Sequence, residues 1–233
     1  MIQGFYMQSN NTFTIKYYDE IIKKAKSNDY VFVTVHEYFD LGCPTTGYFI
    51  LRHDLDKHPQ TLQKQLDVEI SNGVRSTIYA RVTANDYNVL SYPVLKMLRG
   101  AEDDGFEIGL HTNFVEYATI NSLDPMKVLS MENELLSSFF DVRGLAPHRD
   151  LNYAYNSLPF IKRNWNEIKT IGFDYEAYDD QIFSSCVYVN EGFNPHLCWR
   201  NNAPEDVIET GVSIYMMTHN HWWYDENPFE EWR

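Results

Sequence analysis

A short acidic motif carries the strongest candidate for chemistry in this chain. Asp54 and Asp56 stand two positions apart, soon after the apolar run at 48–51. If the chain stays extended there, both carboxylates point the same way, and two carboxylates in one pocket repel each other unless a cation or a proton separates them. A divalent metal ion resolves that conflict, because one aspartate can bind the ion while the other acts as a general base on water.

Histidines follow three further apolar runs. His111 comes after 106–110 and His148 after 143–147, and both are suitable neutral imidazole ligands. One aspartate, two histidines and a water molecule form the usual open site of a catalytic zinc ion. His219 follows 212–217 and is a candidate for protonating a leaving amine, since histidine titrates near neutral pH.

Several of these features also have a purely structural interpretation. The charged block 52–59 is compatible with a solvated loop that holds internal salt bridges. His53 alternates to the side opposite Asp54, which predicts a supporting or structural role, whereas Arg149 is placed to orient a carboxylate such as Asp54 or to lower its pKa. The tandem tryptophans at 222–223 fit equally well a flat wall for a sugar ring and a place in the core.

The elements that must position these residues alternate along the chain between short apolar runs and helical patterns. This alternation is typical of an α/β protein with a mostly parallel sheet, in which the carboxyl ends of the strands converge on one face. Residues far apart in sequence would then meet in one pocket. We expect strands at 48–51, 76–82, 106–110, 143–147, 172–176 and 212–217, and helices at 17–26, 61–72, 92–98, 125–140 and 158–168.

Composition and charge narrow the classes of partner. The net charge of -14 disfavours nucleic acid and anionic membranes, because both require a basic surface. No apolar run approaches the roughly 20 residues that span a bilayer, and the first residues lack the pattern of a signal peptide, so a cytoplasmic location is expected. The three cysteines form no CxxC pair, which argues against a disulfide framework or a cysteine zinc cluster. We expect one domain over 1–233, with a lead-in at 1–47 and a catalytic core at 48–224.

Five short motifs follow one another along the chain. They are Arg-His-Asp-Leu-Asp at 52–56, Gly-Val-Arg-Ser-Thr-Ile-Tyr at 73–79, Gly-Phe-Glu-Ile-Gly-Leu-His at 105–111, His-Arg at 148–149 and Met-Thr-His at 217–219. Their order and spacing resemble the polysaccharide deacetylase superfamily, which includes carbohydrate esterase family 4, and in particular a divergent branch with an RHDVD-type first motif. The similarity extends from about residue 14 to residue 224.

The resemblance implies a fold, an activity and a set of residue roles. The fold is a distorted (β/α) barrel, and the activity is removal of an N- or O-acetyl group from a carbohydrate with a divalent metal ion, typically Zn²⁺. Carried over to this sequence, Asp54 is the base, Asp56 and His111 bind the metal, Arg149 is the arginine of the third motif, and His219 is the late catalytic histidine.

One position departs from the family pattern. The common pattern has a second histidine four residues after the first, and here that position is Val115. We therefore expect His148 to complete the metal triad, as in similar divergent members. The leading hypothesis is a deacetylase of an N-acetylated sugar or related amide. The alternatives are a catalytically silent barrel that binds a glycan or metabolite, and a hydrolase of other non-peptide C–N bonds. Neither the exact substrate nor the oligomeric state follows from the sequence.

Overall fold

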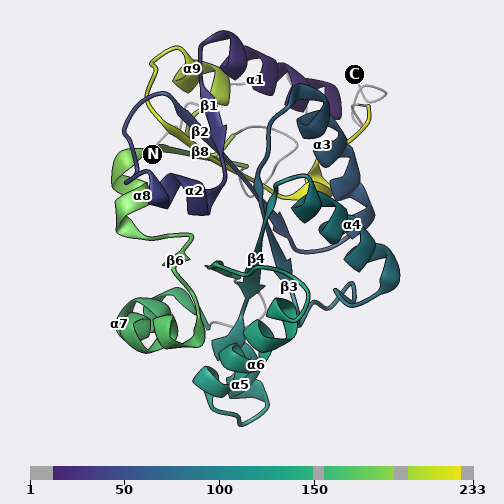
Figure 1. Cartoon of the computed structure of the whole chain (residues 1–233), viewed down its shortest axis with the longest axis vertical. Helices are drawn as coiled ribbons and strands as arrows, with labels where there is room; N and C mark the ends of the chain where they lie inside the picture. Colours follow the sequence, from purple (N-terminus) through teal and green to yellow (C-terminus); the bar gives the residue numbers. More distant parts are fainter. Residues whose placement is uncertain (1–12, 149–154, 192–198, 227–233) are drawn as a thin grey trace, which may run out of the picture.

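The computed structural model describes residues 13–148, 155–191 and 199–226, which are built around one eight-stranded sheet (Figure 1). The sheet order is β6-β5-β4-β3-β2-β8-β7, β1 pairs with the first part of β2, and all these pairs are parallel. The expected α/β class with mostly parallel strands is confirmed. The strands are β1 Val31–Val33, β2 Tyr48–Leu55, β3 Thr77–Arg81, β4 Glu107–Thr112, β5 Gly144–Pro147, β6 Tyr175–Glu176, β7 Val187–Asn190 and β8 Ile214–Thr218.

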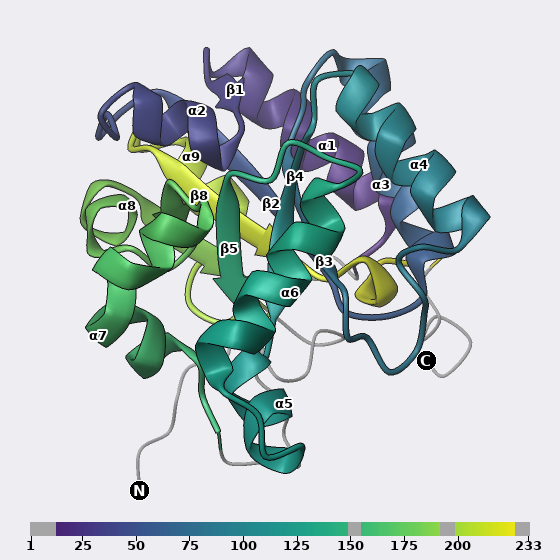
Figure 2. The same cartoon turned by 60° about the horizontal axis from the view of Figure 1, so that its bottom comes forward.

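Helices surround the curved sheet, which forms an open, distorted barrel whose described ends are β6 and β7 (Figures 1 and 2). Helices α1 and α3 pack side by side, as do α5 and α6. Among the helices that the structure describes, none combines the length and the apolar character that crossing a bilayer requires. The helices are α1 Ile15–Ser27, α2 Val35–Asp40, α3 Pro59–Asn72, α4 Tyr92–Asp103, α5 Phe114–Ile120, α6 Pro125–Ser137, α7 Leu158–Ile168, α8 Asp180–Ser185 and α9 Pro204–Ile208, with 3₁₀ turns η1 Lys169–Ile171 and η2 Asn220–Trp222.

Local signals explain where the helices begin and end. Helix α1 begins after Thr14, whose hydroxyl accepts a hydrogen bond from the backbone N–H of Tyr17 at 3.1 Å. Helix α2 begins with a capping box in which Thr34 and Glu37 each bond the other's backbone N–H. Helix α3 ends at Gly73, whose φ of 65° is the left-handed conformation that glycine adopts without a steric cost.

Strand β2 is longer than the sequence predicts, and this changes the setting of the acidic motif. The apolar pattern predicts a strand at 48–51 followed by a polar turn, but β2 continues to Leu55. Arg52, His53 and Asp54 therefore lie inside the strand, and all three are buried. The strand continues because β3 and β8 flank it on both sides and bond its backbone, while the two charges on its inner face pair with each other. The interpretation of 52–59 as a solvated loop is wrong for this part of the block.

Residues on alternate positions of the strands fill the interior of the barrel. Tyr79 on β3 lies against Gly109 on β4, where an added Cβ would come within 2.5 Å of the tyrosine ring. Tyr175 on β6 lies in the same way against Gly144 on β5, and its hydroxyl accepts a hydrogen bond from Tyr79 at 2.9 Å. This polar aromatic layer closes the barrel below the carboxyl ends of the strands, so polar groups beyond it face the open end.

Candidate metal centre

Three side chains from different strands meet at the open end of the barrel. Asp56 follows β2, His111 lies near the end of β4, and His148 follows β5. Their potential ligand atoms all lie within 4.8 Å of one another. The Nε2 atoms of both histidines are 3.2 Å from Oδ1 of Asp56, and the two imidazole rings are nearly perpendicular at 86°. The structure therefore brings together the three residues that the sequence predicts as metal ligands.

The strand register explains this convergence. His111 pairs with Arg81 on one side and with Ala146 on the other, so the ends of β3, β4 and β5 lie at one level. The backbone N–H of His148 donates to the carbonyl oxygen of Thr112 at 2.7 Å, which continues the β4–β5 pairing by one step. Parallel strands with matched ends place their following residues at one edge, and this edge is where the three ligand candidates lie.

The hydrogen bonding of His111 supports a cation at this place. Its Nδ1 lies 2.9 Å from the carbonyl oxygen of Ala146, which can only accept, so Nδ1 carries the proton. In the neutral ring, Nε2 then directs a lone pair at the Asp56 carboxylate, and two acceptors at 3.2 Å repel unless a positive centre lies between them. Two imidazoles and one carboxylate are ligands that a divalent zinc ion accepts.

Asp56 is held in its charged form. Burial by itself would raise the pKa of this carboxyl, but the hydrogen bonds and charges of His111 and His148 lower its pKa well below the usual value. An anionic carboxylate in a half-buried position requires a compensating positive charge nearby. Without a metal ion, the two rings supply this charge when they are protonated. With both rings neutral, a bound cation would supply it instead.

Asp54, the candidate base, is paired with an arginine of its own strand. Arg52 donates from Nε to Oδ1 at 2.7 Å and from Nη2 to Oδ2 at 2.8 Å. Oδ2 also lies 3.7 Å from Nε2 of His111, so the carboxylate borders the ligand cluster. Burial would raise the pKa of Asp54, but the charge of Arg52 and then of His111 lowers it below the usual value. Asp54 and Asp56 do face the same side of the chain, as their spacing predicts.

His219, the candidate acid, is held by a buried carboxylate. Glu191, which follows β7, accepts hydrogen bonds from the backbone N–H of His219 at 3.0 Å and from Trp223 Nε1 at 2.8 Å, and its Oε2 lies 3.1 Å from His219 Nδ1. The Nε2 atom is then directed at the cluster, 3.6 Å from Oδ2 of Asp56. Burial would lower the pKa of His219, but the hydrogen bond and charge of Glu191, together with the charges of Asp56 and Asp54, raise it to about 9.

Arg52 and Glu191, which pair with the candidate base and acid, were not predicted as site residues. Arg52 had a usable signal, because it stands two positions before Asp54 and alternation puts both on the same face. Glu191 had none, since the four-residue strand β7 was not predicted. Arg149, expected to orient Asp54, lies outside the described residues.

The remaining predicted residues divide between core and site. His53 is buried on the opposite side of β2, where its ring nitrogens lie 2.8 Å from Thr218 Oγ1 and 2.6 Å from Glu69 Oε1. Trp223 is buried in the core, whereas Trp222 is half-buried with its ring centre 4.5 Å from that of His219. The core interpretation is confirmed for Trp223, and Trp222 packs against the same core cluster from its edge. Val115 packs against the apolar core, outside the ligand set.

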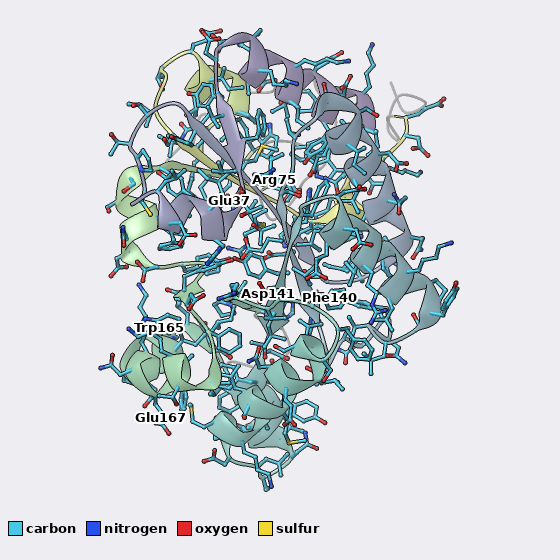
Figure 3. All side chains as sticks on the ribbon, in the orientation of Figure 1. Glu37, Arg75, Phe140, Asp141, Trp165 and Glu167 are labelled. Atoms are coloured by element: carbon cyan, nitrogen blue, oxygen red, sulfur yellow. The ribbon has the colours of Figure 1, made fainter. Side chains whose placement is uncertain are left out.

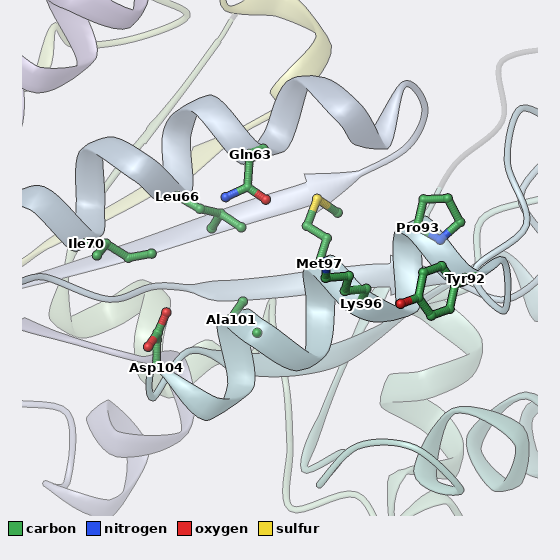
Figure 4. A pocket seen from close by; sticks show the side chains of 10 residues that line it. Gln63, Leu66, Ile70, Tyr92, Pro93, Lys96, Met97, Ala101 and Asp104 are labelled. Carbon is green, nitrogen blue, oxygen red and sulfur yellow. The ribbon is translucent and has the colours of Figure 1, made fainter.

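A surface groove of about 480 Å³ lies elsewhere, between α3 and α4 (Figure 4). Its walls include Leu66, Ile70, Tyr92 and Met97, and among the residues that the structure describes Asp104 is the only carboxylate that lines it. It contains none of the clustered histidines and aspartates, so it is separate from the candidate metal centre.

Comparisons with known proteins give similarity at the level of folds. No family model matches the chain, and no curated protein matches it. Among solved structures, the chain is similar to the Streptococcus pyogenes deacetylase PplD in complex with acetate, with 15% identity, 86% of this chain and 88% of that chain covered, and a TM-score of 0.49. It is also similar to WbmS from Bordetella bronchiseptica, a proposed polysaccharide deacetylase involved in O-antigen biosynthesis, with 14% identity, 84% and 80% covered, and a TM-score of 0.46. Similarity at this level does not show what the chain does. The proposed reaction therefore depends on the geometry of the site.

Proposed function

We propose that this chain is a metal-dependent hydrolase that removes the acetyl group from an N-acetylated sugar or a related amide. The observation that carries the proposal is the convergence of Asp56, His111 and His148 on one point at the open end of the barrel. Oδ2 of Asp54 lies 3.7 Å from His111 of this cluster, and Nε2 of His219 lies 3.6 Å from Asp56. A base and an acid that border a cation site are the parts that hydrolysis of an amide needs.

Each residue then has a defined task. When bound, a divalent ion such as Zn²⁺ supplies a Lewis acid that polarises the acyl oxygen and promotes the loss of a proton from water. Asp54 is anionic, because Arg52 lowers the pKa of its carboxyl, so it can accept that proton. Glu191 holds Nδ1 of His219 and, together with the charges of Asp56 and Asp54, raises its pKa to about 9 in the metal-free protein. His219 is thereby suited to donate a proton from Nε2 to the departing amine.

The choice of an acetylated carbohydrate rests on the motif order of the polysaccharide deacetylases that the sequence resembles. The half-buried ring of Trp222, next to His219, supports it, because the face of an aromatic ring is a suitable surface for a sugar ring. A hydrolase of another non-peptide C–N bond would use the same site and differ only in its substrate.

A catalytically silent barrel is the alternative from a different class, and it was suggested by Val115 in place of a histidine. The three-residue ligand set forms without position 115, and this supports a working metal site over a silent one. Elemental analysis separates the two: the purified, metal-replete protein is expected to hold about one ion per chain. Less than about one tenth of an ion per chain would support the silent barrel.

The variant Asp54→Asn tests the assignment of the base. It keeps the size of the side chain but removes its ability to accept a proton, so turnover of an acetylated amino sugar should fall by at least about 10²-fold. The metal content should stay at the wild-type level, because Asp56, His111 and His148 are unchanged. Retained turnover in Asp54→Asn would rule out Asp54 as the base.

A further inference from the structure

Arg52 is a completely buried charge whose guanidinium group spans both oxygens of Asp54. The two residues lie on the same face of β2, with Arg52 one step deeper in the barrel. The two bonds, at 2.7 Å and 2.8 Å, form a planar fork, and such a fork fixes the plane of a carboxylate as well as its charge. A carboxylate without it turns easily, because the last torsion of an aspartate side chain has a broad, shallow profile.

An aromatic cage fixes the arginine in turn. The guanidinium carbon lies 4.6 Å from the ring centre of Tyr178 and 5.0 Å from that of Tyr79. Nη1 donates to the hydroxyl of Tyr215 at 3.1 Å, and Nη2 donates to the hydroxyl of Tyr178 at 3.3 Å. The hydroxyl of Tyr215 donates onward to the carbonyl oxygen of Ala177 at 3.1 Å. A cation with this many fixed neighbours has one orientation.

We infer that Arg52 is the positioning residue that holds the Asp54 carboxylate toward the ligand cluster, an inference that rests on the proposed role of Asp54 as base. Each carboxylate oxygen can accept more than one hydrogen bond. Arg52 donates one hydrogen bond to each oxygen. A second acceptor position on Oδ2 remains available on the side of His111, whose Nε2 lies 3.7 Å away. The resemblance identifies Arg149 as the arginine of the third motif, which was expected to orient Asp54. Among the described residues, the two-point contact with Asp54 is made by Arg52.

The substitution Arg52→Lys separates position from charge. Lysine keeps the positive charge but has one point-like ammonium group, which cannot span two oxygens in a plane. If Arg52 positions the base, kcat of the metal-loaded enzyme should fall by about 10²-fold, as expected for a base displaced by about 1 Å, while KM stays within a factor of about three. A change in KM alone would contradict the inference.

The matched control is Arg75→Lys. Arg75 also forms a two-point pair with a carboxylate, because its Nε lies 3.3 Å from Oε2 of Glu37 and its Nη2 bonds the other oxygen. This pair is exposed and links α2 to the turn before β3 (Figure 3). It lies at the amino end of that strand, whereas the ligand cluster lies at the carboxyl ends of the strands. Arg75→Lys should keep the wild-type kcat. A fall in kcat in this control as well would show a general effect of replacing arginine by lysine in a carboxylate pair.

A structural readout makes the test independent of activity. In a crystal structure of metal-free Arg52→Lys, at least one Asp54 oxygen should move by about 1 Å or more from its wild-type place, and in Arg75→Lys neither should move. An unmoved Asp54 carboxylate in Arg52→Lys would overturn the inference even if the wild-type protein showed no hydrolysis. Loss of the proposed function would instead appear as an inactive wild-type protein, whatever the position of Asp54.

The double variant Tyr178→Phe, Tyr215→Phe covers the case in which Arg52→Lys does not fold. It removes the two hydroxyls that bond the guanidinium and leaves both rings and Arg52 in place. The expected result is a displaced Asp54 carboxylate and a fall in kcat of about fivefold, the effect of roughly one hydrogen bond. Wild-type kcat together with an unmoved carboxylate would count against the inference.

Discussion

At the scale of residues, the candidate site consists of two neutral pairs around one carboxylate. Arg52 balances Asp54, and Glu191 balances His219. Asp56 is the carboxylate that remains, and imidazole nitrogens of His111, His148 and His219 lie 3.2, 3.2 and 3.6 Å from its oxygens. In a buried environment each charge must be compensated, so the negative charge of Asp56 is the one that a bound cation would balance.

The pair of Glu191 and His219 makes the stability depend on pH. The pKa of His219 is raised from 6.5 to about 9 in the folded protein, so the stabilisation is complete below pH 6.5 and is lost as the pH rises through about 9. In metal-free protein, wild type should exceed Glu191→Gln in the free energy of unfolding at low pH, because Glu191 gives the largest contribution that raises this pKa. The difference should shrink by roughly 1–3 kcal/mol across that interval. Urea unfolding of both proteins at a series of pH values measures it, and an excess that does not change with pH would contradict the pairing.

At the scale of elements, the barrel depends on close contact between tyrosine rings and glycines of neighbouring strands. Tyr79 fills the space over Gly109, and Tyr175 fills the space over Gly144. These rings occupy the level just below the ligand cluster, where Tyr79 also borders the guanidinium of Arg52. The glycines therefore set how closely β3, β4, β5 and β6 bring the site residues together.

Gly109→Ala should destabilise the protein. The new Cβ would lie 2.5 Å from the Tyr79 ring and 3.1 Å from the carbonyl oxygen of Gly144, so either the ring or a strand must shift. Overpacking of this kind costs about 1–3 kcal/mol. Thermal or urea unfolding measures the loss.

Gly100→Ala is the matched control for that prediction. Gly100 lies on the exposed face of α4, and an added Cβ there meets no atom within 4 Å. Alanine favours a helix over glycine by up to about 1 kcal/mol, so this variant should be as stable as the wild type or more stable. Equal destabilisation by both substitutions would show that the Tyr79 contact is not the cause.

At the scale of the whole molecule, metal binding should couple to folding. The three ligand candidates come from chain positions 56, 111 and 148 and meet only in the folded protein, so an ion bound there favours the folded state. At a free Zn²⁺ concentration about 100 times the dissociation constant, the gain is about 2.7 kcal/mol. That gain corresponds to a rise of roughly 5–10 °C in Tm for a chain of this size.

Two histidine variants test where the ion binds. His111→Ala should lose the zinc-dependent rise in Tm, because it removes one of the three ligands. His36→Ala should keep it, because His36 lies at the start of α2 beside Asp40 and Asp174, away from the cluster. Calorimetry with and without zinc measures both, and a rise that survives in His111→Ala would place the ion elsewhere.

The net charge of -14 also acts on the molecule as a whole. It disfavours polyanionic partners at long range, whereas the chemistry at the open end depends on charges within a few ångströms. The global balance therefore limits the class of partner but does not define the substrate.

The sequence by itself predicted the class of fold and three of the residues that meet at the candidate site. Apolar runs followed by polar residues predicted parallel strands, and their carboxyl ends do bring Asp56, His111 and His148 together. These features are readable because strand alternation and helix periodicity are local, and because parallel strands share one orientation.

Only the tertiary structure decided how the site is supported. It placed Arg52 inside β2 in a tyrosine cage, placed Glu191 behind His219, and buried Trp223 while leaving Trp222 beside the site. The short elements β1, α2, α5, α8, β7 and α9 were not predicted, because three to seven residues carry too little periodicity to identify. Contacts such as that between Arg52 and Tyr215 join residues far apart in the chain, and they follow from strand order and register, which local patterns do not encode.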